Sequence, residues 1–322
     1  MTATPDRYWE AVSAGRRDEA IAVARAAVAE GLSVEQVLRQ YVAHCQRRVG
    51  ELWQTNEWSV AREHGATAIG EAVVRSLAAQ TPVPRGPRLL VACVEREWHS
   101  LPAMILTESL RSRGVDARFL GAHVTREGLL GHLLDLGPRA ALISASLSSS
   151  LLACRRMIEA VRGTSTPVIA GGSAFGSDRE LAQYLGATAH GTTPQDVIDA
   201  LETLPKHVSP AGPLTHRAAD EASVVGGRDD SATERITETV GGALPEAARR
   251  TLQHQVPYVV DSVAGALLTQ RPELARAAFD WLADVVVRRG GDGEQTTRAL
   301  AAALAEEFAD LPETRALLRS LG

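Results

Sequence analysis

Apolar and polar residues repeat with a helical period along the first part of the chain. Between residues 18 and 80, apolar positions recur every three or four residues in three segments that are separated by short polar connections. Two of these segments begin directly after Ser33 and Ser59, and serine is a preferred residue at the N-cap of a helix. Helices with short connections are typical of a small bundle. We therefore predict an N-terminal four-helix bundle over residues 1–80.

The period changes after residues 81–87, where three prolines and a glycine interrupt the chain. Five short apolar segments with strand-like composition follow, and amphipathic segments of helical length separate them. They are residues 88–94, 116–121, 140–146, 167–172 and 187–191. This alternation is typical of a parallel sheet with helices on both faces. It predicts a flavodoxin-like (Rossmann-like) α/β domain over residues 86–205.

The remainder of the chain is predicted to be a linker followed by helices. Residues 206–232 are rich in Pro, Gly, Asp, Ser and Thr, a composition typical of a linker. Helical periodicity then continues to the C-terminus and predicts an all-helical domain over residues 233–322. The expected fold class is therefore α/β plus all-α.

Composition and charge exclude several classes of function. The formal charge of -5, the pI near 6.0 and the lack of a lysine-arginine block argue against direct nucleic-acid binding, which depends on phosphate contacts. No apolar run reaches membrane-spanning length, and the N-terminus lacks a signal pattern, so we expect a soluble, cytoplasmic protein without a membrane partner. The scattered cysteines Cys45, Cys93 and Cys154 offer neither a disulfide framework nor a metal cluster, and we expect buried thiols.

Candidate chemistry gathers at the ends of three predicted strands. Carboxyl ends of parallel strands meet at one rim of the sheet, where ligands bind. A neutral imidazole is a good ligand for a transition metal, and a carboxylate two residues away can orient the ring. The candidates are Glu97 and His99 after the first strand, Ser144 and Ser146 after the third, and Gly171 and Gly172 after the fourth.

Simpler explanations exist for each of these residues. A histidine after a strand can be a solvated or capping residue, and serine and glycine are ordinary turn residues. A phosphate cradle is another alternative, although no Walker pattern is present. A zinc centre would need three or four ligands, and no cluster in the sequence offers them. If His99 binds a metal, the small residues beside it suggest a large cofactor that brings its own equatorial ligands.

The three strand ends together resemble the cobalamin-binding fingerprint Asp-x-His-x-x-Gly, Ser-x-Leu, Gly-Gly of methionine synthase and its relatives. This resemblance implies that His99 is the lower axial ligand of cobalt, that Glu97 is its hydrogen-bonding partner, and that Ser144, Ser146, Gly171 and Gly172 line the channel for the nucleotide tail. The chain departs from the fingerprint at three positions. They are Glu97 in place of Asp, Pro102 in place of Gly and Ser146 in place of Leu.

A second resemblance lies in the N-terminal bundle. Trp53, followed after nine residues by Glu63 and His64, is similar to the Trp and Glu-His signature of light-sensing cobalamin photoreceptors. It implies adenosylcobalamin as the cofactor, with Trp53, Val60 and Glu63 against the adenosyl group and His64 close by. The alternative is that the tryptophans fill the core and Glu63 and His64 form a solvated pair.

One position departs from the light-dependent repressors among these photoreceptors. They carry a histidine after the tryptophan, and that histidine binds cobalt after photolysis, whereas this chain has Gln54. The default upper ligand after photolysis is therefore water, with His64 or His123 as the alternatives.

The C-terminal region has two interpretations. It can be a dimerisation bundle with Trp281 in its core. Alternatively, the domain order resembles that of the photocobilins, which implies biliverdin as a second chromophore. Arginines would then pair with the bilin propionates, and His254 or Tyr258 would bond the pyrrole nitrogens or terminal carbonyls. No cysteine lies in this region, so a thioether link there is excluded.

The sequence thus favours a non-enzymatic light sensor. Photolysis of the cobalt–carbon bond would change domain packing or the assembly of a homo-oligomer, and a downstream signalling protein is a candidate partner. One alternative is a corrinoid carrier protein of a cobalamin-dependent methyltransferase system. Another is a light-insensitive cobalamin-binding scaffold.

Overall fold

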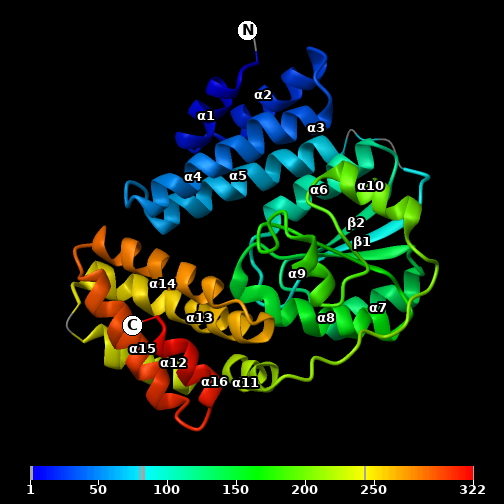
Figure 1. Ribbon diagram of the computed structural model, residues 1–322. Coiled ribbons are helices and arrows are strands. Elements are labelled where there is room, and N and C mark those ends of the chain that lie inside the picture. Colours follow the sequence, from blue (N-terminus) through cyan, green and yellow to red (C-terminus); the bar gives the residue numbers. More distant parts are fainter. Residues whose placement is uncertain (1–2, 80, 82–83, 243, 322) are drawn as a thin grey trace. The chain divides into compact units, whose positions relative to one another are not determined.

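The computed structural model describes residues 3–79, 81, 84–242 and 244–321, and Figure 1 shows its helices and strands. The chain divides into two compact units. The first unit comprises residues 1–144, 160–172 and 187–210, and the second comprises residues 145–159, 173–186 and 211–322. The chain thus passes between the units several times within the α/β segment. The domain boundaries stated from the sequence stay predictions.

The first unit begins with a helical bundle. Its helices are α1 (Pro5–Ser13), α2 (Arg17–Ala29), α3 (Val34–Val37), the π-helical segment η1 (Leu38–Ala43), α4 (His44–Gln54) and α5 (Val60–Ala78). Ser33 Oγ accepts the Gln36 N–H at 3.1 Å, and Ser59 Oγ accepts the Arg62 N–H at 3.3 Å. These serines satisfy donors that a helix start leaves unpaired. Both helix starts predicted from the sequence are confirmed.

Two tryptophans and two arginines stack across this bundle. The rings of Trp9 and Trp58 lie 5.6 Å apart at an interplanar angle of 15°. The guanidinium of Arg48 lies 4.0 Å from the Trp9 ring, and that of Arg62 lies 4.1 Å from the Trp58 ring. Each such contact contributes on the order of 1 kcal/mol. Because Trp58 lies in the turn between α4 and α5, the stack fixes this turn against α1.

The sheet of the first unit has five parallel strands. They are β1 (Arg88–Cys93), β2 (Asp116–Gly121), β3 (Ala140–Ser144), β4 (Val168–Gly171) and β5 (Ala189–His190), in the order β2-β1-β3-β4-β5. This topology confirms the flavodoxin-like α/β class. The strand order reverses at β1, since the chain proceeds to β2 on one side and to β3 on the other. Ligands of open α/β sheets bind at such a switch point, beside the carboxyl ends of the strands.

Helix α6 (Ser100–Ser112) follows β1 and belongs to two hydrophobic cores. Leu101 and Met104 are buried in the core of the bundle. Ala103 and Leu110 are buried in the core of the sheet, which also receives side chains from α10 (Pro194–Thr203). Helix α7 (Arg126–Leu136) follows β2. A helix that is apolar on two faces can join two layers, and α6 therefore joins the bundle to the sheet.

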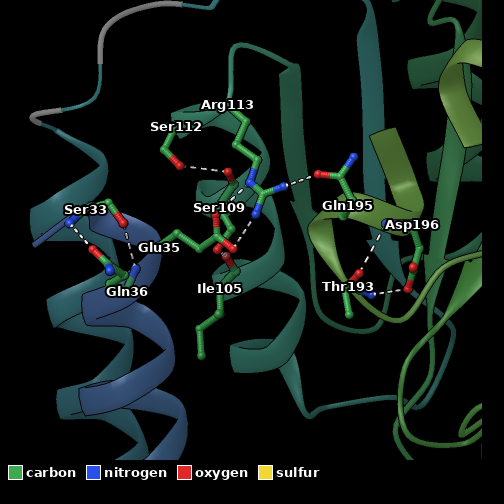
Figure 2. Close-up of polar contacts among 10 residues, drawn as sticks. All are labelled: Ser33, Glu35, Gln36, Ile105, Ser109, Ser112, Arg113, Thr193, Gln195 and Asp196. Atoms are coloured by element: carbon green, nitrogen blue, oxygen red, sulfur yellow. Dashed lines mark hydrogen bonds and ion pairs between the residues drawn. The ribbon is translucent and has the colours of Figure 1, made fainter. Parts of the chain in front are cut away.

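Polar contacts hold both ends of α6 within this unit. Ser100 Oγ donates to a carboxylate oxygen of Glu71 on α5 at 2.7 Å. At the other end, Arg113 donates to both carboxylate oxygens of Glu35 at 2.7 and 2.8 Å and to Gln195 Oε1 at 2.8 Å, as Figure 2 shows. A bidentate arginine–carboxylate pair fixes geometry better than a single contact. The bundle is thus attached to α6 at two points that lie a whole helix apart.

The second unit is helical among its described residues. Its elements are η2 (Ser148–Ser150), the first part of α8 (Leu151–Gly163), α9 (Arg179–Tyr184), α11 (Arg217–Gly226), α12 (Asp230–Gly241), α13 (Glu246–Thr269), α14 (Pro272–Val287), α15 (Gly293–Glu307) and α16 (Pro312–Arg319). Helix α11 lies inside the segment that composition predicts as a linker. Its N-cap residue His216 accepts the Ala219 N–H at 3.2 Å through Nδ1, which the composition of the segment does not reveal. Within the described part of the chain, no helix has the length and hydrophobicity to span a membrane.

A buried carboxylate joins the first and last helices of this unit's C-terminal region. Glu221 on α11 is 4% exposed and accepts the N–H of Glu313 at 3.2 Å and the N–H and hydroxyl of Thr314 at 2.8 and 3.0 Å. These N–H groups lie in the first turn of α16, where a helix leaves its donors unpaired. Glu221 therefore caps a helix that is about ninety residues away in the sequence.

Gly171 gives a direct test of the packing between β4 and the end of β5. A Cβ atom on Gly171 would lie 2.2 Å from the carbonyl oxygen of Gly191, whereas a Cβ on Gly131 of α7 would meet no atom within 4 Å. We expect Gly171→Ala to lower the free energy of unfolding by about 1–3 kcal/mol because of overpacking. The matched Gly131→Ala should raise it by about 0.5–1 kcal/mol because alanine favours a helix. Urea unfolding of both variants measures the difference, and equal stabilities would contradict the β4–β5 packing.

Candidate functional site

The loop between β1 and α6 forms a compact pair of side chains. His99 is the N-cap residue of α6, and its Nδ1 lies 2.6 Å from Glu97 Oε1. The same oxygen accepts the backbone N–H of His99 at 2.9 Å. Because a carboxylate accepts hydrogen bonds, Nδ1 carries a proton, and in the neutral ring Nε2 keeps its lone pair. The Glu97 side chain is 1% exposed and that of His99 is 52% exposed, so the acceptor is buried while the ring remains accessible.

The charge around His99 favours its protonated form when no metal is present. The hydrogen bond that His99 donates to Glu97 raises the pKa of His99, burial partly opposes this, and the charges of Glu97 and Glu63 raise the pKa further. A metal that binds Nε2 must therefore displace a proton at low pH. The same carboxylate increases the basicity of a ligating imidazole, and this arrangement recurs at metal sites in proteins.

Helix α5 brings Glu63 to the same region of the first unit. The Glu63 charge contributes to the raised pKa of His99, so the two side chains are within electrostatic range of each other. Glu63 Oε1 accepts the hydroxyl of Thr67 at 2.8 Å, and Gln46 Nε2 of α4 donates to the Thr67 oxygen at 2.7 Å. This chain of hydrogen bonds fixes the carboxylate, and one of its members comes from a second helix.

The other bundle candidates lie around the start of α5. Val60 is 53% exposed, so much of its apolar surface is uncovered. His64 Nδ1 lies 2.7 Å from the Val60 carbonyl oxygen and 3.0 Å from Glu63 Oε2. The side chain of Trp53, at the end of α4, is half-buried. The structure thus places Glu63 within electrostatic range of His99, and it holds His64 against its own helix.

The remaining strand-end candidates lie one and two strands away from His99. Ser144 is 4% exposed and is in register with Cys93 on one side and Gly171 on the other. Gly172 has a φ of 105°, a conformation that favours glycine. The space above the Gly171 Cα is filled by the carbonyl group of Gly191, so strand packing alone already requires a glycine there.

Ser146 belongs to the second unit. Its carbonyl oxygen accepts the hydroxyl of Ser173 at 2.7 Å, and its side chain is half-buried. The Ser173 hydroxyl thereby links the loop after β3 to the loop after β4 within this unit. Two serines that follow neighbouring strands are therefore joined directly to each other.

The C-terminal candidates lie on α13, one helical turn apart. His254 is exposed, with Nδ1 2.7 Å from the Arg250 carbonyl oxygen, and Tyr258 is half-buried. Trp281, which the dimerisation interpretation places in a core, is also half-buried. Six arginines of this region are candidates to pair with bilin propionates in the biliverdin interpretation, and each makes a contact of its own. Arg249 and Arg250 pair with Glu246, Arg271 with Asp178, Arg288 with Asp284, and Arg276 and Arg289 donate to the carbonyl oxygens of Ser320 and Val285.

His123 takes part in this region in a way that the sequence does not indicate. Its Nδ1 accepts the backbone N–H of Arg96 at 2.7 Å, and its ring stacks on Trp98 with centroids 4.7 Å apart. From the sequence alone, His123 is only an alternative upper ligand of cobalt. No spacing rule relates positions 96–98 to position 123, because they meet only when β1 and β2 pair in the sheet.

The donors of this site fit a metal that brings most of its own ligands. His99 offers a single nitrogen, and in the described ranges no group of three or more His, Cys, Asp or Glu side chains could hold a metal ion by itself. A zinc centre built by the protein would need three or four. One accessible imidazole, oriented by a buried carboxylate, therefore suits a cobalt corrinoid, whose ring supplies the equatorial ligands.

Comparison with known proteins bears on the same two regions of the chain. Residues 87–199 match a family model described as a B12 binding domain, and residues 5–78 match a second model with the same description. The chain is 28% identical over 142 residues to the HTH-type transcriptional repressor CarA of Myxococcus xanthus, over 43% of this chain and 46% of the repressor. The chain thus spans about half the length of that relative.

A solved structure shares the fold. The monomethylamine corrinoid protein of Methanosarcina barkeri superposes with a TM-score of 0.52 at 16% identity, over 61% of this chain and 96% of that protein. The likeness extends over nearly the whole corrinoid protein. The solved structure shows the shared fold, and the two B12-binding-domain matches support the conclusion that the chain binds cobalamin.

Proposed function

We propose that this protein is a light sensor that binds adenosylcobalamin, with His99 as the lower axial ligand of cobalt. The observation that carries the proposal is the Glu97 and His99 pair at the carboxyl end of β1, with Glu63 of α5 in electrostatic range. In this arrangement Glu97 holds the Nδ1 proton and leaves Nε2 for the metal. Bound adenosylcobalamin would supply a cobalt–carbon bond that light can break.

The bundle would form the cover above the metal. Trp53, Val60 and Glu63 would contact the adenosyl group, and the exposed Val60 supports this because a ligand would bury its apolar surface. Glu63, already fixed by Thr67, would accept hydrogen bonds from the adenosyl group. His64 would lie close by. Gln54 in place of a histidine leaves water as the expected upper ligand after photolysis.

The nucleotide tail of the cofactor would lie beside the carboxyl ends of β3 and β4. Ser144, Ser146, Gly171 and Gly172 would line its channel, as the fingerprint implies. Loss of the adenosyl group would change how the bundle and the sheet pack, and with it the oligomeric state or the affinity for a downstream signalling protein. The contacts at the two ends of α6 are the ones such a change would break.

We further propose biliverdin as a second chromophore of the C-terminal helices. His254 and Tyr258 lie one turn apart on α13, so both can reach one elongated ligand along that helix. The ion pairs of Arg249 and Arg250 with Glu246 are exposed and weak, so a bilin propionate could compete for these arginines.

The second candidate function is a corrinoid carrier for a methyltransferase. The fold shared with the monomethylamine corrinoid protein favours this candidate. It requires that the bundle move away so that a partner enzyme can reach the cobalt. The polar and apolar contacts along α6 would then have to open in each cycle.

Illumination separates these candidates. After reconstitution with adenosylcobalamin, green light should change the absorption spectrum, release the adenosyl group and alter the molecular mass in solution. Methylcobalamin in the same chain serves as the comparison, because a carrier should prefer it. An unchanged spectrum and mass after illumination would refute the sensor, and transfer of a methyl group to an added methyltransferase partner would favour the carrier.

Substitution of His99 tests its proposed role as the lower axial ligand of cobalt. We expect His99→Ala to weaken cobalamin binding about ten- to hundredfold and to restore the spectrum of a cofactor with its own base bound. His132→Ala, on the exposed face of α7, is the matched control and should leave binding unchanged. Absorption spectra during a cobalamin titration give both quantities. Unchanged affinity and spectrum in His99→Ala would remove this residue from the site.

The pH dependence of coordination follows from the charge around His99. Ligation needs the neutral ring, so protons compete with cobalt for Nε2, and histidine coordination should weaken as the pH falls below the raised pKa of His99. Glu97→Gln keeps an acceptor for Nδ1 but removes the negative charge. We therefore expect this variant to lower the pKa of His99 in the ligand-free chain. An NMR titration of the ring measures it, and an unchanged pKa would show that Glu97 does not control the ring.

Biliverdin binding can be tested on the whole chain without cobalamin. Addition of biliverdin should produce a red-absorbing complex, and His254→Ala and Tyr258→Phe should each weaken it about tenfold, an effect on the order of 1.4 kcal/mol. Gln253→Ala on the exposed face of α13 is the control. A lack of spectral change on mixing, or equal affinity in all variants, would exclude the proposed bilin site.

A further inference from the structure

Two strained residues flank the Glu97 and His99 pair. Arg96 has a φ of 65° and His123 has a φ of 48°, so both occupy the left-handed region. This conformation costs a residue other than glycine about 1–2 kcal/mol. Such residues persist when their surroundings over-determine them, and they concentrate at functional sites. The contacts that hold them here are therefore informative.

His123 makes three contacts with three consecutive residues of the β1–α6 loop. Its Nδ1 accepts the backbone N–H of Arg96 at 2.7 Å, and the backbone N–H of His123 donates to the Glu97 carbonyl oxygen at 3.0 Å. Its ring lies parallel to Trp98, with an interplanar angle of 3° and 4.7 Å between centroids. The residues before His99 are thus held by one side chain and its backbone.

These contacts join two loops that follow neighbouring strands. The adjacent Val124 N–H donates to the Cys93 carbonyl oxygen at 3.0 Å, so the β2–α7 loop continues the pairing of β1 and β2 beyond the strands. Trp98 is 61% exposed, and burial alone therefore does not hold it in place. The stack on His123 is what orients this indole.

We infer that His123 is a positioning residue that holds the Glu97 and His99 pair in the geometry required of the lower axial ligand. It acts by fixing the backbone from Arg96 to Trp98, which in turn places the buried Glu97 carboxylate against His99 Nδ1. The inference rests on the proposed role of His99. It differs from the idea that His123 binds cobalt from above, because here its Nδ1 is occupied by the Arg96 N–H.

Three variants separate the role of the His123 Nδ1 acceptor from the role of the His123 ring. His123→Asn keeps an acceptor atom at the same number of bonds from the backbone, and asparagine tolerates the left-handed conformation. His123→Phe keeps a ring for Trp98 but removes the acceptor, and His123→Ala removes both. His132→Phe on α7 is the matched control. Circular dichroism and thermal unfolding establish that each variant is folded.

The deciding measurement is the ¹⁵N chemical shifts of the His99 ring in the ligand-free chain, which report the fraction of the ring with the proton on Nδ1. We expect this fraction to be high in the unmodified chain, the control and His123→Asn, and to fall in His123→Phe and His123→Ala. Cobalamin affinity, measured separately, should fall on the order of tenfold in the last two. Because His123→Asn is best suited to this backbone, its result holds even if His123→Phe does not fold.

Two results would overturn the inference. One is an unchanged His99 proton position in folded His123→Ala. The other is a fraction in His123→Asn as low as that in His123→Ala, since the acceptor would then not matter. Failure of the proposed function looks different, because His99→Ala would then bind cobalamin normally. The ¹⁵N measurement needs no cofactor, and its outcome stands in either case.

Discussion

The hydrogen bond between the Glu97 carboxylate and His99 Nδ1 is the interaction on which the proposed cofactor site depends. A carboxylate that is 1% exposed loses its hydration, and such a group is tolerated only when protein donors replace the water. Glu97 Oε1 receives two, from the Nδ1 and the backbone N–H of His99. The same contacts that make burial of Glu97 possible therefore set the proton on Nδ1 and leave Nε2 accessible. Folding of this loop therefore also fixes the orientation of the His99 ring.

The sheet and the bundle both serve this pair. The strand order places the end of β1 at the switch point, between β2 and β3, and α6 starts directly at His99. Because α6 contributes to the cores on both sides, the position of the bundle is coupled to the loop that carries His99. Ser100, the next residue, is bonded to Glu71 of α5. Movement of the loop that carries His99 would therefore be transmitted to the bundle through α6, which suits the proposed sensor and also limits how freely a carrier could open.

Much of the fold could be predicted from local patterns, and long-range contacts account for the rest. Serine caps and hydrophobic periods suffice for the starts of α3 and α5 and for the positions of the strands along the chain, because these depend on neighbours in sequence. The proximity of Glu97 and His99 follows from their spacing. The hydrogen bond of His123 with Arg96 does not, because it requires the pairing of β1 with β2. Gly171 shows another limit, since its small size suggests a ligand channel but is already required by the approach of Gly191.

The claim that His99 binds cobalt has a direct spectroscopic test. Cobalamin in its cobalt(II) form, bound to the chain, gives an electron paramagnetic resonance spectrum whose superhyperfine splitting reports the axial nitrogen. With unlabelled protein each line is a triplet, and protein labelled with ¹⁵N-histidine should give doublets, because the axial nitrogen would then have nuclear spin one half. Triplets that persist after labelling would show that the nitrogen belongs to the cofactor's own base, and would contradict this account of the site.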